Sequence, residues 1–163
     1  MGVCRTLGTG LILAAAALLV VARPAAAQSG DAEALAQAAQ SDMQSLVETC
    51  EQDAAALQSD CEEKFADLAE RLPEDKATRK IEKIGAKYFK KFGKLRSKVE
   101  KRVDKVAVKA AKRIAKVGGD PGLIEQLDQQ RAALHTEANL MLDDVWGAIA
   151  ETQQEVIDGL NGP

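Results

Sequence analysis

Residues 73–116 read PEDKATRKIEK, IGAKYFKKFGK, LRSKVEKRVDK and VAVKAAKRIAK, four segments of eleven residues with one shared pattern. Positions one, five and nine of each segment are apolar after the opening Pro73, and positions four, seven, eight and eleven are always basic. Eleven residues make three turns of an α-helix, so equivalent positions return to the same side. The stretch therefore predicts one long helix with an apolar face and a continuous basic face beside it.

The preceding stretch also follows an eleven-residue period. Extending its apolar register beyond Leu72 leads to Lys83, whereas the apolar positions that follow are Ile81 and Ile84. The phase slips at Pro73, whose fixed φ suits the first turn of a new helix. We expect a tight break there, and a kinked continuous helix is the alternative. The apolar series steps by 4, 4 and 3 residues: Leu35, Ala39, Met43, Leu46, Cys50, Ala54, Leu57, Cys61, Phe65, Leu68 and Leu72.

A second break follows the basic helix. Gly118 and Gly119 can take the left-handed conformation that ends a helix, Asp120 can cap the next helix, and Pro121 suits its first position. The third helix then runs to about Leu160. Its apolar series is looser: Leu127, Leu134, Ala138, Met141, Val145, Ile149, Val156 and Leu160.

Helices over about 31–72, 74–117 and 121–160 have nearly equal lengths and short connections. Helices joined in this way pack as antiparallel neighbours. The sequence therefore predicts an all-α fold, a long antiparallel three-helix bundle or coiled coil with eleven-residue (hendecad) periodicity. Folding at the two breaks brings Phe89 and Phe92 beside Trp146 of the third helix.

The N-terminus has the features of a cleaved signal peptide. Arg5 precedes an apolar run from Leu11 to Ala22, and Ala25-Ala26-Ala27 offers a cleavage site of small residues. We expect cleavage after Ala27, export to the periplasm or cell exterior, and a single helical domain over residues 28–163. An uncleaved membrane anchor is the alternative.

Charge is segregated along the chain. Residues 28–72 carry eleven acids and two bases, residues 73–117 carry five acids and seventeen bases, and residues 118–163 carry nine acids and one base. One interpretation is that the basic helix is matched to its acidic neighbours and fixes the order of the helices. Exposed ion pairs contribute only about 0–1 kcal/mol each, so such matching affects register more than stability.

The alternative is that part of the basic face stays exposed and binds a polyanion or a membrane surface. In a three-helix bundle, positions seven and eleven of the repeat are the ones we expect to face solvent. The candidate binding residues are Arg79, Lys83, Lys90, Lys94, Lys101, Lys105, Lys112 and Lys116. An exported protein would meet an anionic envelope component there, and the signal peptide argues against intracellular nucleic acid.

Aromatic residues interleave with these bases. Tyr88 and Phe92 occupy apolar positions of the repeat and are expected in the core, whereas Phe89 lies off that face, nearer the third helix. Aromatic side chains among cations can stack on bases or sit at a membrane surface. Core packing is the simpler interpretation of Tyr88 and Phe92.

Cys50 and Cys61 stand eleven residues apart, about 16 Å along a continuous helix, which is beyond disulfide reach. They are then buried core thiols or form bridges between chains. The third alternative is a helix break between them, since Ser59 to Glu62 matches a capping box.

No catalytic, phosphate-binding or metal-binding motif is recognisable, and His135 is expected to be a solvent-side residue. We therefore expect a non-enzymatic interaction or scaffold protein of the cell envelope without a cofactor, one that self-associates or binds another helical protein. The alternatives are a polyanion or membrane-surface binder that uses the basic residues over 76–116, and a holdase-type chaperone.

Overall fold

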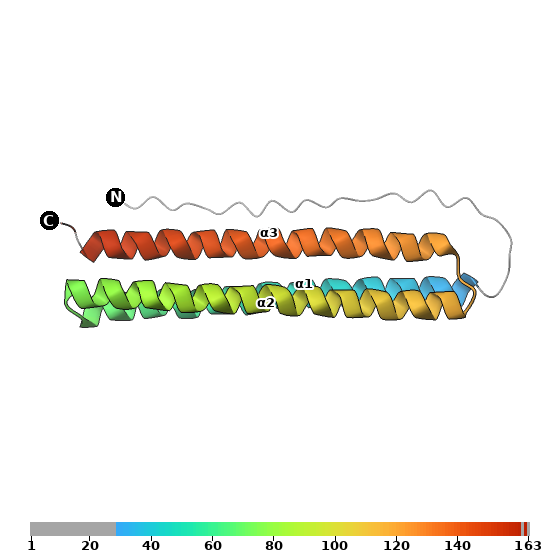
Figure 1. Cartoon of the computed structure of the whole chain (residues 1–163), viewed down its shortest axis with the longest axis horizontal. Coiled ribbons are helices and arrows are strands. Elements are labelled where there is room, and N and C mark those ends of the chain that lie inside the picture. Colours follow the sequence, from blue (N-terminus) through green and yellow to red (C-terminus); the bar gives the residue numbers. More distant parts are fainter. Residues whose placement is uncertain (1–28, 161, 163) are drawn as a thin grey trace, which may run out of the picture.

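The computed structural model describes residues 29–160 and Gly162, so the expected signal peptide over residues 1–27 lies outside the described residues. The chain forms three helices: α1 (Ser29–Arg71), α2 (Glu74–Lys116) and α3 (Pro121–Leu160). Each helix packs against the other two along an elongated bundle, and the chain reverses direction at each short connection (Figure 1). The prediction of an all-α three-helix bundle is confirmed.

The break between α1 and α2 lies at Leu72 and Pro73. Pro73 has φ −57° and ψ 145°, an extended conformation that cannot continue a helix. Its carbonyl oxygen accepts hydrogen bonds from the N–H groups of Lys76 and Ala77, both at 2.9 Å. Pro73 thus caps α2 from outside its first turn, and the kinked continuous helix does not form. α1 itself begins at Ser29 and places Asp31 in its first turn, where the helix dipole favours a carboxylate.

The break between α2 and α3 uses the residues that the sequence indicates. Gly118 has a φ of 70°, and its N–H donates to the Ala115 carbonyl at 3.3 Å. The Gly119 N–H donates to the Ile114 carbonyl at 2.9 Å, which completes a Schellman motif. On the other side, Asp120 Oδ1 accepts a hydrogen bond from the Gly122 N–H at 2.9 Å and caps α3.

The core of α2 follows positions five and nine of its repeat, which are buried throughout. At position one, Leu95 is buried, Ile84 and Val106 are partly buried, and Val117 is exposed. The buried side chains include Tyr88, Phe92, Leu95, Val99 and Val103. The buried residues cover a broad arc of the helix surface because α2 contacts α1 and α3 at once. The basic positions fall outside that arc.

The core of α1 agrees only in part with the sequence prediction. Six residues of the predicted series are buried: Ala39, Met43, Cys50, Ala54, Cys61 and Phe65. The buried line of α1 also includes Ala32, Ala36 and Val47, whereas Leu35 and Leu46 are only partly buried. Leu35 and Leu46 line the groove between α1 and α2. On α3, similarly, Leu142 is buried although the predicted series omits it, and its predicted neighbours Met141 and Val145 are only partly buried.

A pair of glycine substitutions tests the C-terminal cap of α2. Gly118→Ala forces a β-carbon into the left-handed region and should lower the free energy of unfolding by about 1 kcal/mol. Gly93→Ala is the matched control, because no atom lies within 4 Å of an added β-carbon there and the residue is inside α2. The control should raise stability by about 0.5–1 kcal/mol. Urea unfolding of both variants measures the difference, and an equal effect of the two would contradict the cap.

Candidate functional site

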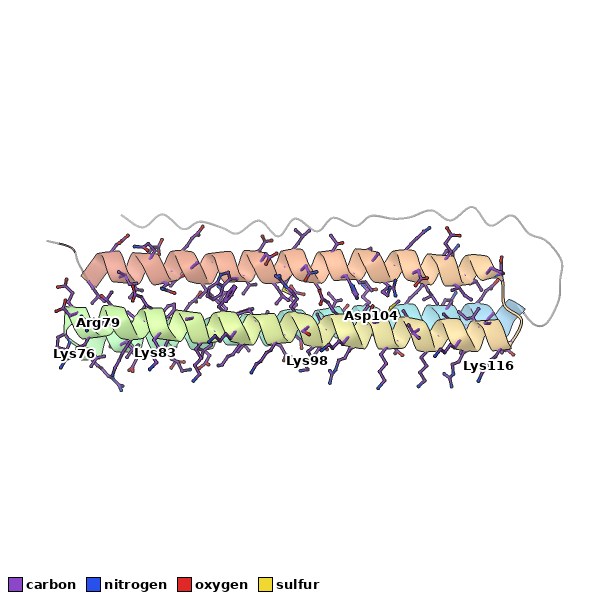
Figure 2. All side chains as sticks on the ribbon, viewed as in Figure 1. Lys76, Arg79, Lys83, Lys98, Asp104 and Lys116 are labelled. Atoms are coloured by element: carbon purple, nitrogen blue, oxygen red, sulfur yellow. The ribbon has the colours of Figure 1, made fainter. Side chains whose placement is uncertain are left out.

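The basic face of α2 is the most distinctive surface of the bundle. In Figure 2, Lys76, Lys83 and Lys98 project from the side of α2 that is turned away from α3, whereas Asp104 lies on the side towards α3. The eight residues that the sequence places along this edge are all exposed: Arg79, Lys83, Lys90, Lys94, Lys101, Lys105, Lys112 and Lys116. We call these eight residues the basic row.

Few bases of α2 are paired with carboxylates. Among the described residues, three of the seventeen have a carboxylate oxygen within 4 Å: Lys91 with Asp60, Arg96 with Asp143, and Lys98 with Asp53. The Lys91 and Lys98 pairs are 3.8 and 3.6 Å long. No member of the basic row takes part in these pairs. The intramolecular matching that the charge order suggests is therefore limited to three contacts between helices.

The side of α2 that faces α3 carries two acids, Glu100 and Asp104, beside one base, Arg96. Glu100 accepts a hydrogen bond from the Asn139 amide at 3.2 Å. Asp104 lies 3.4 Å from His135 Nε2 and 3.8 Å from Arg131 Nε. His135 is thus turned towards α2 and is not the solvent-side residue that the sequence suggested. The single base of α3 meets an acid of α2, so the positive charge of α2 is concentrated on its other side.

A polar cluster joins α1 to α2 at Asp60. Its carboxylate accepts hydrogen bonds from Lys64 and from the Tyr88 hydroxyl, and Lys91 Nζ lies 3.8 Å from the centroid of the Tyr88 ring. Hydrogen bonds from Lys64 and then Tyr88 lower the pKa of Asp60. Tyr88 is buried, and Asp60 gives its hydroxyl group the hydrogen-bond partner that a buried tyrosine usually has. The repeat predicts that Tyr88 is a core residue, but it gives no sign that Asp60 accepts a hydrogen bond from the Tyr88 hydroxyl.

Phe89 lies apart from the basic row. Phe89 is 58% exposed, and the centroid of its ring lies 5.1 Å from that of Trp146 on α3. Phe92 is buried and its ring lies 6.1 Å from the same indole. The aromatic residues of this segment therefore pack against α3 or in the core, and they leave the row itself without an aromatic side chain.

Cys50 and Cys61 are buried free thiols on the uninterrupted α1. The capping-box sequence near Ser59 lies inside the helix and starts no new one. Burial is the main cause that raises the pKa of Cys50, and it raises the pKa of Cys61 to about 11. Both thiols are therefore protonated and shielded at neutral pH, so they are poor nucleophiles.

In the part of the chain that the structure describes, no group of three His, Cys, Asp or Glu residues could hold a metal ion. None of the three helices is apolar enough over sufficient length to cross a membrane. Comparison of the chain with protein-family models, curated proteins and solved structures finds no match.

Thiol labelling tests the continuous α1. We expect iodoacetamide at pH 8 to leave Cys50 and Cys61 unmodified in the folded protein, because both thiols are buried and largely protonated. Labelling should become complete in urea, and peptide mapping by mass spectrometry reads out each site. An intrachain bond between the two cysteines in the unreduced protein would contradict a continuous helix.

Proposed function

We propose that this chain is an exported, non-enzymatic helical protein that binds an extended anionic partner along α2. The observation that supports the proposal best is that the basic row is exposed and forms no ion pair with the described carboxylates. The proposed molecule is a long antiparallel bundle with eleven-residue periodicity. Such a repeat brings bases back to one side about every 16 Å, over a helix about 65 Å long.

The partner that fits this row presents phosphate, sulfate or carboxylate groups in sequence. A lysine ammonium is a mobile point charge on a flexible stem and makes no shape-specific demand on the anion. Seven of the eight row residues are lysines. The row therefore favours a charge-dense linear polymer over a ligand of one defined shape.

An exported protein can meet such charges on a polymer or on a membrane surface. Interfacial helices bury an apolar face, often with Trp, Phe or Leu, among the lipid headgroups. Most large apolar residues of α2 instead face the bundle core, with Tyr88, Phe92 and Val103 all buried. Phe89 and Val108 are exposed, but two separate side chains do not form the continuous apolar face that an interfacial helix buries. The geometry therefore favours a soluble polyanion such as an acidic polysaccharide over insertion into lipid.

The flanking helices limit how a polyanion approaches. α1 and α3 carry most of the acids, and these would repel an anionic polymer from two sides of the bundle. Binding would be confined to one edge and would be weak and sensitive to salt, because it depends on exposed charges that ions screen within about 10 Å at 0.1 M.

The three ion pairs between bases of α2 and acids of the flanking helices favour a second, structural role for the charge order. They connect α2 to α1 at Asp53 and Asp60 and to α3 at Asp143. These contacts support an envelope scaffold in which acidic helices flank a basic one. They leave the basic row available, so the two roles are compatible.

Retention on a heparin column tests the binding role. The wild-type protein should be retained at low salt despite its negative formal net charge and should elute as NaCl rises. A variant with four row residues changed to Gln should elute at distinctly lower salt: Lys90, Lys94, Lys101 and Lys105. Absence of wild-type retention, or equal retention of both proteins, would refute the proposal.

A charge-restored variant is the control for net charge. This variant carries the four Lys→Gln changes and also replaces four exposed acids of α3 with the corresponding amides, Gln for Glu and Asn for Asp: Glu137, Asp144, Glu151 and Glu155. Retention should stay low in this variant, because the row is still missing. Sedimentation with vesicles of phosphatidylglycerol forms a second arm, and tighter binding to vesicles than to heparin would overturn the preference for a soluble polymer.

A further inference from the structure

The groove between α1 and α2 repeats with the period of the sequence. One stretch is lined by Leu35, Asp42 and Arg113. The next is lined by Leu46, Asp53 and Arg102, each eleven residues along the chain from its counterpart in the first stretch. Each stretch therefore combines an apolar floor with bases from α2 and one acid from α1.

The widest of the three stretches in this groove has a volume of about 420 Å³. Its floor contains Leu57 and Leu95, and three lysines of α2 rise beside it: Lys91, Lys94 and Lys98. Leu57 is only partly buried by the rest of the bundle. The groove thus has apolar surface still in contact with water. Its rim has a net positive charge, because three lysines stand beside one carboxylate, Asp53.

The outer face of α3 has complementary chemistry. Leu140 is 60% exposed, the largest value among the exposed large hydrophobic residues. Glu137 and Asp144, three residues before it and four after it, share its side of the helix and are also exposed. Overall, α3 carries eight acids and one base.

We propose that α3 of a second copy of this chain docks in the groove between α1 and α2. Leu140 would cover Leu57 and Leu95, while Glu137 and Asp144 would face the lysines of the rim. Charge selects this occupant over a groove-to-groove contact, because two facing grooves would bring two basic helices together. α3 has 40 residues and is about 60 Å long, so contact along its length leaves room for an interface of standard size, about 1,200–2,000 Å².

The contact joins two different surfaces, so each copy keeps one unused surface after pairing. Such heterologous contacts continue into rings or open chains of copies. The inference does not rest on the proposed polyanion binding, although Lys94 belongs to both surfaces. A polyanion bound at the row would therefore compete with α3 and release the assembly.

Two charge-reversed variants test the docking. The first carries Glu137→Lys and Asp144→Lys on α3, and the second carries Lys94→Glu and Lys98→Glu on the rim. All four side chains are exposed, and the one ion pair that is lost, Lys98 with Asp53, contributes little to stability because it is exposed to solvent. We therefore expect circular dichroism to report unchanged helix content in both variants. At low salt, each variant alone should associate at least tenfold more weakly than wild type in sedimentation velocity, because like charges then meet at the contact.

Mixing the two variants is the decisive experiment. The reversed α3 of one fits the reversed rim of the other, and the unchanged surfaces fit each other, so the mixture should assemble as wild type does. A wild-type protein that stays monomeric at all concentrations at low salt, or a mixture that stays monomeric, would overturn the inference. Heparin retention of the α3 variant, whose row is intact, reports separately on the proposed function.

Discussion

The burial of one apolar face of α2 between two neighbouring helices is the interaction on which the rest of the molecule depends. The buried residues of α2 recur at eleven-residue spacing, as in Phe92, Val103 and Ile114. Because the bases occupy fixed positions in the same repeat, burying the apolar face also determines where they lie. Fourteen of them remain without a carboxylate partner among the described residues, and their side chains form one edge of a rod.

This arrangement gives the bundle a transverse separation of charge. α2 contributes a basic edge, and α1 and α3 contribute acidic surfaces. The few ion pairs between helices involve Asp53, Asp60, Asp104 and Asp143. Exposed pairs of this kind stabilise a fold only slightly, by about 0–1 kcal/mol each. The charge order is therefore better suited to recognition, of a polyanion or of another copy, than to stability.

Local sequence signals predicted the helix boundaries and the core of α2 well. The register of the apolar residues changes at Pro73, where α1 gives way to α2. The residues from Gly118 to Pro121 cap the end of α2 and the start of α3. Each of these signals depends only on nearby residues. The basic row was predictable for the same reason, because a strict repeat determines which side of a helix a residue occupies.

Features that depend on neighbouring helices could not be predicted in the same way. The buried face of α1 extends beyond the predicted series to Ala36 and Val47 because α1 contacts α2 and α3 together. The hydrogen bond between Tyr88 and Asp60 requires the register of two helices to within a residue, which the spacing of apolar residues alone does not supply. The exposure of Leu140 likewise depends on how α3 is rotated in the bundle.

Urea unfolding of a variant in which position eleven of the repeat is neutralised tests the central claim, that the basic row takes no part in holding the bundle together. The variant replaces Lys83, Lys94, Lys105 and Lys116 with Gln, a residue of similar helix propensity. We expect the free energy of unfolding to stay the same or rise slightly, because like charges along α2 repel one another by about 0.2–0.5 kcal/mol per pair. A loss approaching 1 kcal/mol for each removed charge would show that these lysines are paired within the bundle and would contradict the account.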